Sequence, residues 1–302
     1  MTITAKIIAD SVSLQGHRLT TMELRYPRFI HSEFMTHRVF SRNASSSRAI
    51  PVERMIQDVI DDTAMPIHWG KNQPGMQAAE ENDEFVISHV DEAVWVPREE
   101  VWCEARDRAI ETARAFTRAG YHKQIVNRLL EPFMHINVVV TATDWDNFFT
   151  LRLHPDAQPE IHELARCMKK AMDESCPQKL HSGEWHLPYT SEEDVQRLLG
   201  AYKDFPDVAT LRDLKVLSVA RCASVSYKTV DGKPMTMERA QSIYDKLVKA
   251  DVFHASPFEH QATPDESYIS PNGTRLWDNP GLQGNFLGWV QNRKLMETGL
   301  TL

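Results

Sequence analysis

The sequence predicts a mixed α/β fold with several long helices. The first observation is a stretch with a period of two, in which Met22, Leu24 and Tyr26 alternate with polar residues until Pro27. This alternation is typical of a half-buried strand. The second observation is a set of apolar stripes at spacings of three and four, which predict amphipathic helices after Pro97 and after Pro155.

In the first half of the chain, four elements follow this strand. Residues Phe29 to Val39 fit a helix with one apolar face, and the hydroxyl-rich run 41–48, closed by Pro51, fits a loop. A short helix is expected near 51–61. A long helix is expected from Pro97 to Gly120, with the stripe Trp102, Ala105, Ala109, Ala113 and Phe116.

The second half alternates between helices and connectors. A helix is expected from about 121 to 131, stopping at Pro132, and Val138–Val140 fits either a short strand or a buried helical turn. A helix starting at Pro155 and Asp156 has the stripe Ala157, Ile161, Leu164, Met168 and Ala171 and ends before Pro177. We further expect a connector over 177–213 with a small helix near 191–202, a helix over 237–250, and a loop or hairpin over 263–285.

Composition excludes several classes of protein. The 302 residues include 34 Lys and Arg against 42 Asp and Glu, a net charge of −8, and 42% are hydrophobic. Disordered chains have less apolar content. Binding to a nucleic-acid polymer usually needs a net basic face. No run of about 18 uncharged apolar residues occurs, so no membrane association is expected.

The cysteines and the N-terminus indicate a reducing compartment. Cys103, Cys167, Cys176 and Cys222 have no CxxC spacing and are too sparse for a disulfide framework, so free thiols are expected. The segment Met1–Lys6 has no apolar core like that of a signal peptide, which favours a cytoplasmic location.

The densest polar cluster is Thr36-His37-Arg38 followed by the run from Ser41 to Arg48. Arginine binds phosphate bidentately and hydroxyls donate further hydrogen bonds, so a phosphate site fits this segment. A solvated loop with a capping serine fits it equally well.

Three further segments carry polar groups with two interpretations each. Arg152 lies near Asn147 and an aromatic pair, but it could simply pair with Asp156 or Glu160 on a helix face. Arg128 could be an exposed helix cation. In His254–His260, Ser256 and Pro257 fit a helix start, and the absence of HxxxH spacing makes a metal site improbable.

Together these segments resemble the flavin-dependent thymidylate synthases. That family's Arg-His-Arg, seven residues, then Ser signature is similar to Thr36-His37-Arg38 followed by Val39–Ser45 and Ser46, with Arg48 two places on. The runs 147–153 and 156–161 resemble its Asn-Phe…Leu-Arg…Ala-Gln-x-Glu-Ile block. Ser256–His260 resembles its Thr-Pro-Phe-Glu-His block, and Val219–Tyr227 resembles the segment that normally begins the fold.

The order of these blocks differs from the familiar arrangement, because the last two come after the signature instead of before it. The chain therefore resembles a circular permutant of the family's mixed or antiparallel α+β fold, which is tolerable where termini lie close and exposed. We expect one domain over 1–302. Its parts are a signature and nucleotide-binding part (1–176), a connector (177–213) and a permuted block with an extra tail (214–302).

The resemblance implies specific roles for single residues. Arg152 would face the uracil, where a cation stabilises developing negative charge. It implies FAD contacts for His37, Arg38, Thr141, Thr143, Asn147, Ser256 and Glu259. It implies contacts with the deoxyuridylate for Glu33, Ser46, Ser47, Arg48, Arg128 and Arg152.

The implied reaction is methylation of dUMP to dTMP, with methylenetetrahydrofolate as carbon donor, NADPH as reductant of the flavin, and no metal. Family members are typically homotetramers. Thr36, Ala44 and Thr143 depart from the family pattern at positions that meet flavin or nucleotide. A related C5 modification such as hydroxymethylation, or nucleotide and flavin binding without turnover, therefore remain alternatives.

Overall fold

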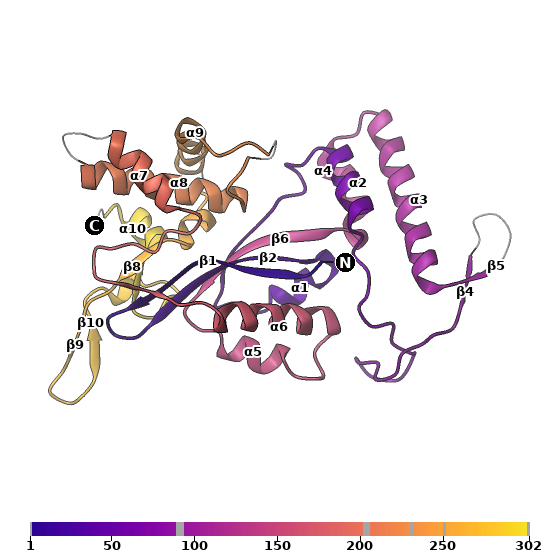
Figure 1. The fold of residues 1–302 in the computed structure, drawn as a ribbon, viewed down its shortest axis with the longest axis horizontal. Coiled ribbons are helices and arrows are strands. Elements are labelled where there is room, and N and C mark those ends of the chain that lie inside the picture. Colours follow the sequence, from indigo (N-terminus) through magenta and orange to yellow (C-terminus); the bar gives the residue numbers. More distant parts are fainter. Residues whose placement is uncertain (1, 89–93, 202–205, 230–231, 250–251, 301–302) are drawn as a thin grey trace.

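The computed structural model describes residues 2–88, 94–201, 206–229, 232–249 and 252–300. A five-stranded sheet runs through the middle of the molecule in the order β3-β6-β2-β1-β7 (Figure 1). All its pairings are antiparallel except the parallel pair β1–β7. The strands are β1 (Thr4–Ser13), β2 (Arg18–Pro27), β3 (Ser41–Ala44), β6 (His135–Ala142) and β7 (Gln178–Leu180). The expected mixed α/β fold is confirmed.

The predicted strand at 22–26 is the centre of β2, and Val138–Val140 belong to strand β6 instead of a helical turn. Strand β1 was not predicted from the sequence. Ala5 and Ile7 alternate with the exposed Thr4 and Lys6, but the alternation is short because a β-bulge between Ile7 and Ala9 interrupts it. Its pairing with β2 and the packing of Ala5 and Ile7 against the main core both hold it in the sheet.

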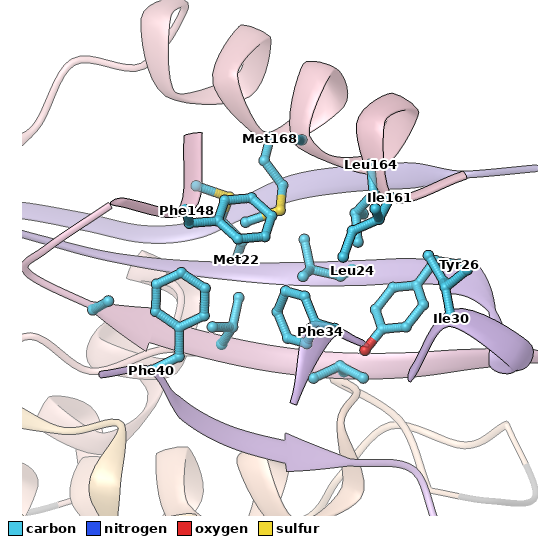
Figure 2. Close-up of a cluster of buried hydrophobic side chains, with 14 of the residues drawn as sticks. Met22, Leu24, Tyr26, Ile30, Phe34, Phe40, Phe148, Ile161, Leu164 and Met168 are labelled. Atoms are coloured by element: carbon cyan, nitrogen blue, oxygen red, sulfur yellow. The ribbon is translucent and has the colours of Figure 1, made fainter. Parts of the chain in front are cut away.

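The main core lies between one face of the sheet and the helices α5 (Asp146–Arg152) and α6 (Pro159–Asp173). Figure 2 shows Met22 and Leu24 of β2 below Leu164 and Met168 of α6. Each such side chain contributes roughly 1.5–3 kcal/mol by leaving water. The predicted stripe of α6 is confirmed at Ile161, Leu164 and Met168, but the helix begins at Pro159.

The expected helix from Phe29 to Val39 is wrong beyond Phe34. The chain forms a 3₁₀ turn, η1 (Arg28–Ile30), then α1 (His31–Phe34), and then turns away. The hydroxyl of Thr36 donates to the Glu33 carbonyl at 2.7 Å, and Phe34 and Phe40 both enter the core with ring centroids 5.8 Å apart. On a continuous helix two side chains six residues apart would point about 120° away from each other, so a turn is needed to bring both rings into one core.

The expected loop at 41–48 is also wrong in part, since Ser41–Ala44 form the edge strand β3 paired with β6. The sequence does not predict this strand because its side chains are mostly polar. Its backbone pairing with Val138–Thr141 defines it. Residues 41–44 of the signature are therefore fixed in the sheet, and residues 45–50 form the loop between β3 and α2.

A helical arm lies to one side of the sheet (Figure 1). It comprises α2 (Val52–Asp61), α3 (Arg98–Arg118), α4 (Lys123–Val126) and the 3₁₀ segment η2 (Asn127–Phe133), which share a buried cluster that includes Met55, Ile110 and Leu130. The helices at 51–61 and after Pro97 are confirmed. The expected stop at Pro132 is wrong, because the 3₁₀ segment accommodates this proline and continues to Phe133. A two-stranded hairpin, β4 (Val86–Ser88) and β5 (Val94–Val96), precedes α3.

The C-terminal part lies at the opposite side of the sheet (Figure 1). The expected helices near 191–202 and 237–250 are α7 (Glu192–Ala201) and α9 (Met237–Val248), and the tail contains a hairpin. The connector does not extend to 213, because helix α8 (Pro206–Ser224) occupies its end. The remaining elements are η3 (Ser256–Glu259), β8 (Ala262–Pro264), β9 (Ser267–Ile269), β10 (Arg275–Trp277), η4 (Pro280–Leu282), β11 (Trp289–Gln291) and α10 (Asn292–Thr298).

Helix α8 was not predicted from the sequence. All of its residues from Val216 to Cys222 are buried, so this stretch has no exposed polar face. The Ser256 prediction also needs correction. Ser256 is the first residue of η3, and Ala255 is its N-cap.

The segment after η3 returns to the start of β2. Ala262 and Trp289 share a buried cluster with Leu19, and the Trp289 indole N–H donates to the His17 carbonyl at 3.2 Å. The residues that follow the Phe-Glu-His turn thus lie beside the strand that leads into the signature.

Candidate functional site

A cavity of about 620 Å³, here called cavity 1, lies between the signature and the C-terminal part. Its volume falls within the range of about 300–1,000 Å³ that is usual for small-molecule sites. Ser46 and Ser256, which come from opposite ends of the chain, both line it. Its other polar and charged lining residues are Glu23, Asn43, Ser45, Arg54, Asp58, Asn137, Ser224, Ser226, Lys228, Thr229 and His254.

Asn43 of β3 holds the two walls of cavity 1 together. Its side-chain amide donates to the Cys222 carbonyl at 2.8 Å, at the end of α8. Its side-chain carbonyl accepts from the Ser256 hydroxyl at 3.0 Å. One side chain of the signature thereby fixes both segments of the C-terminal block that resemble the start of the family fold.

The tail residue Arg293 forms an ion pair with Glu259. Gln291 of β11 supports this contact by donating to the Glu259 backbone carbonyl at 3.1 Å. The Glu259 carboxylate is therefore engaged by the tail, and Arg293 also contacts Glu297. The tail therefore stabilises the Phe-Glu-His turn through its contacts with Glu259.

His37 and Arg152 form the second polar centre. The Arg152 Nε–H donates to His37 Nε2 at 3.0 Å, and Arg152 Nη2 donates to the Thr36 hydroxyl at 3.4 Å. Burial is the main cause that lowers the pKa of His37 to about 4, and the Arg152 and Arg42 charges contribute to this shift. His37 is thus a neutral acceptor at neutral pH, and it fixes the guanidinium of Arg152. Arg152 does not depend on Asp156 or Glu160 for a hydrogen bond.

A larger cavity of about 760 Å³, here called cavity 2, has Arg152 and Glu33 in its wall. Burial is the main cause that raises the pKa of Glu33; the nearby Glu160 carboxylate adds to this effect and Arg152 opposes it. Within the described part of the chain, no donor bonds to the Glu33 carboxylate. A half-buried carboxylate with a raised pKa, beside an arginine in a cavity, is typical of a functional site.

Several predicted residues lie on the surface. Arg38, Arg48 and Asn147 are exposed. Arg128 is also exposed and pairs with Glu131 at 3.1 Å, three residues on, which matches the interpretation as an exposed helix cation. None of these four lines cavity 1 or cavity 2.

Thr141 is fully buried inside the sheet. Its hydroxyl is hydrogen-bonded to Thr21 Oγ1 at 2.7 Å and to His260 Nδ1 at 2.8 Å. The chain continues from Thr21 to His186 Nε2 at 2.8 Å, and His186 Nδ1 bonds to Ser11 at 2.9 Å. We name this set, Ser11, His186, Thr21, Thr141 and His260, the buried histidine chain. It connects the sheet to the Phe-Glu-His turn.

Thr143 and Ser47 line two other hollows. Thr143 accepts a hydrogen bond from the Leu287 N–H at 3.1 Å, in a hollow of about 720 Å³. Ser47 is buried, and its carbonyl accepts from the Asn127 amide at 2.7 Å beside a hollow of about 310 Å³. The predicted residues are therefore distributed over several hollows of one chain.

The structure brings Ser46 together with Ser256, and Glu33 together with His37 and Arg152. The sequence interpretation missed Asn43, Ser226 and His254, which line cavity 1. Each stands within or beside a segment that carries the resemblance, so the signal was present. Only the folded chain shows that these three face the same cavity.

The residues of cavity 1 fit a flavin nucleotide. Hydroxyls and amides supply hydrogen bonds to ring edges and ribose, and Arg54 and Lys228 supply positive charge for phosphate. Among the residues that the structure describes, no group of three or more His, Cys, Asp or Glu could hold a metal ion. No described helix is both long and apolar enough to cross a membrane. The cysteines form no disulfide, and Cys222 is buried while Cys176 is exposed.

Comparison with known protein families gives a match over more than half of the chain. The family model described as thymidylate synthase complementing protein matches residues 9–178. This range runs from β1 to the start of β7 and includes the signature, the arm, and helices α5 and α6. No curated protein matches the chain.

Proposed function

We propose that this chain, which belongs to the thymidylate synthase complementing protein family, methylates dUMP to dTMP. Membership implies flavin-dependent thymidylate synthesis in general. Our proposal adds dUMP as substrate, methylenetetrahydrofolate as carbon donor, NADPH as reductant and FAD as cofactor. The observation that carries it is the Arg152 guanidinium, which neutral His37 holds in the wall of a cavity.

Arg152 would act on the pyrimidine by charge. Hydride addition and C5 substitution place negative charge on the uracil ring, and a fixed guanidinium stabilises such charge without reorganising. His37 accepts the Nε–H and Thr36 accepts one Nη2–H, so Nη1 and the second Nη2–H of Arg152 would donate to the base oxygens. Glu33, in the same wall, would accept an N–H of the substrate. The protein thus supplies orientation and electrostatics, with no side chain acting as nucleophile.

Cavity 1 would hold the flavin. A bound flavin supplies the hydride chemistry, and the chain binds and orients it through Ser256, Asn43 and the cations of the cavity. His37, Arg38, Thr141, Thr143, Asn147 and Glu259 remain flavin-binding predictions that rest on the resemblance. Of these, Thr141 would act only through the buried histidine chain, because its side chain is fully buried.

The nucleotide phosphate would bind to Arg48 with Ser46 and Ser47, and to Arg128. Arg48 and Arg128 are exposed and lie outside both cavities. A homo-oligomer, a tetramer by resemblance, would bring these arginines to the cavities of a second copy. We also propose a cytoplasmic location, without nucleic-acid or membrane partners.

We propose further that the fold is circularly permuted. The contacts of Ala262 and Trp289 with Leu19 support a cut between the Phe-Glu-His turn and β2, because they place these two chain segments side by side. Asn43 supports the same view by binding both C-terminal blocks to the signature strand.

A related hydroxymethylation is the second candidate. It is favoured by Thr36, which replaces an arginine of the family pattern and contacts Arg152 through its hydroxyl. The change removes one charge beside the pyrimidine. The third possibility, binding without turnover, predicts ligand affinity but no product.

A direct test is to purify the protein and follow its visible flavin absorbance. We expect a yellow protein whose flavin is reduced by NADPH, with NADPH consumption that rises when dUMP and methylenetetrahydrofolate are both added. Bleaching of the flavin without any dTMP would remove the methylation proposal. Absence of bound flavin after reconstitution with FAD would remove the flavin site.

A further inference from the structure

Glu23 lies at the centre of β2, in one row across the sheet with Val139 of β6 and Asn43 of β3. Its neighbours Met22 and Leu24 belong to the main core, so the Glu23 side chain points to the opposite face of the sheet. There it lines cavity 1 together with Asn43. The family resemblance assigns no role to Glu23.

Tyr189, in the connector between β7 and α7, fixes one oxygen of the Glu23 carboxylate. The Tyr189 hydroxyl donates to Glu23 Oε2 at 2.6 Å. Burial, reinforced by Glu23, raises the pKa of Tyr189, so the hydroxyl stays protonated. Lys6, opposite Glu23 on β1, is exposed and forms no ion pair with it. Since no described residue donates to Glu23 Oε1, this second oxygen can accept from a ligand.

The backbone beside this contact is strained. Tyr189 and Val225 have φ angles of +61° and +49°, and no other non-glycine residue in the described ranges has a positive φ. Bulky and β-branched residues rarely adopt this conformation. Both belong to one buried cluster with Val139 and Cys222, and Val225 also lines cavity 1. Because strained residues cluster at functional sites, this cluster beside Glu23 points to a ligand site.

The charges of cavity 1 differ in depth. Glu23 is half-buried beside the buried Val225, whereas the cations Arg54 and Lys228 and the acid Asp58 are exposed. A dinucleotide can therefore place its phosphates at the exposed cations and its ring at Glu23. An ionised carboxylate only accepts hydrogen bonds, so the ring must present an N–H to it. An oxidised flavin ring has one N–H, that of its imide.

We propose that Glu23 accepts the imide N–H of a flavin ring in cavity 1, and that Tyr189 is the positioning residue for Glu23. This inference rests on the proposed function, which assigns the flavin to this cavity. Tyr189 lies outside residues 9–178, which the family model matches, so the connector of this chain supplies the positioning contact. The uracil of dUMP carries the same imide group and is the competing ligand.

The test compares FAD with 3-methyl-FAD, in which a methyl group replaces the imide hydrogen. Equilibrium dialysis of the full-length protein freed of flavin gives both dissociation constants. Wild type should prefer FAD about 10- to 100-fold, because the methyl group removes a charge-assisted hydrogen bond. Glu23→Ala should weaken FAD binding by a similar factor and bind both flavins equally. Equal affinity of wild type for the two flavins would overturn the proposal.

Tyr189→Phe tests the positioning role. It keeps the ring, which packs edge-on against Tyr227 with centroids 4.9 Å apart, and removes only the hydroxyl. The preference for FAD over 3-methyl-FAD should fall about threefold to tenfold. Tyr227→Phe is the matched control, because the Tyr227 hydroxyl bonds to no described residue, and it should leave the preference unchanged. No loss in Tyr189→Phe, or equal loss in both variants, would overturn the positioning role.

Dialysis with dUMP distinguishes the two imide ligands. Glu23→Ala should bind dUMP as wild type does. Weaker dUMP binding with unchanged FAD binding would assign Glu23 to the nucleotide and overturn the proposal. Wild-type protein that forms dTMP but does not discriminate between the flavins would refute the role of Glu23 and leave the proposed function standing. A clear preference for FAD in a protein that forms no dTMP would support the role of Glu23 and refute the proposed function.

Discussion

Cavity 1 and cavity 2 are built in opposite ways. Cavity 1 joins the signature to the C-terminal block, so its walls come from residues more than 200 positions apart, and its lining has two acids (Glu23, Asp58) and two fixed cations (Arg54, Lys228). Cavity 2 uses only residues 29–160, and its lining has three acids and one arginine. The comparison teaches that one chain forms a cavity with balanced charge by joining distant segments, and a cavity with an excess of acids from one half of the chain.

The largest effect is expected at the arginine of cavity 2. Arg152→Ala should lower turnover by about 10²–10³-fold, because it removes the fixed charge beside the pyrimidine. Thermal unfolding should change little, since Arg152 is partly exposed and bonds only to His37 and Thr36 in the described structure. Arg166→Ala, on the exposed face of α6, is the matched control. Near-normal dTMP formation by Arg152→Ala would remove the residue from the mechanism.

Lowering the pH should reduce the stability of the folded protein through the two histidines of the buried histidine chain. Burial lowers the pKa of both His186 and His260 to about 3, so both are neutral in the folded protein. Their unfolded forms take up protons below about pH 6.5 and the folded forms do not until about pH 3, so stability falls as the pH drops through this window.

At pH 5.5 each of these two histidines should cost about 1.4 kcal/mol of unfolding free energy relative to pH 7.5. Urea titrations at both pH values measure the total pH dependence, of which these two histidines account for roughly 3 kcal/mol if they act independently. His37 and His135, whose pKa values are lowered to about 4, add to the total. His186→Gln should reduce the pH dependence, and His68→Gln, at a partly exposed histidine, should leave it in place. Equal stability at the two pH values would contradict the neutral buried pair.

Removal of the exposed Arg48 should affect the nucleotide alone. A charge-assisted bond to phosphate is worth about 1.5–3 kcal/mol, so Arg48→Ala should raise the KM for dUMP by about 10- to 100-fold. Flavin retention after gel filtration should not change. Arg118→Ala, at an exposed arginine at the end of α3, controls for general charge effects. A weakened flavin with an unchanged KM for dUMP would reverse the assignment of the two ligands.

The smallest effect is expected at Ser256. Its hydroxyl donates one hydrogen bond to Asn43, so Ser256→Ala should cost about 1 kcal/mol and weaken flavin binding about fivefold. Equilibrium dialysis with FAD measures the change. Ser270→Ala, in the hairpin connection between β9 and β10, is the matched control, because Ser270 also donates a side-chain hydrogen bond and lines neither cavity. If both substitutions weaken FAD binding equally, Ser256 has no specific role in cavity 1.

The sequence predicted the parts of the fold that have a one-sided apolar pattern. Strand β2 and helices α2, α3, α6 and α9 were found because one face of each is buried. Strand β3 was missed because its side chains are mostly polar, and β1 because a β-bulge interrupts its alternation. Helix α8 was missed because residues 216–222 are buried on every side. Backbone pairing and burial by distant segments, which local periodicity does not record, define these three elements.

The same limit applied to the site, where local motifs were recognised and long-range contacts were not. The motifs identified Glu33, His37 and Arg152, whose direct or electrostatic contacts join two separate segments. They did not reveal Asn43, which holds both walls of cavity 1, because its bonds go to the backbone of Cys222 and to Ser256 far along the chain. They also did not reveal that Thr141 is buried in a hydrogen-bonded chain, since burial depends on the whole sheet.

Mass analysis of the nucleotide product tests the central claim most directly. Purified protein reconstituted with FAD is incubated with dUMP, methylenetetrahydrofolate and NADPH, and the product is compared with the dUMP supplied. The account predicts a product that carries one added methyl group and comigrates with dTMP, and predicts that omission of NADPH abolishes it. A hydroxymethylated product, or unchanged dUMP beside a flavin that NADPH has reduced, would contradict the account.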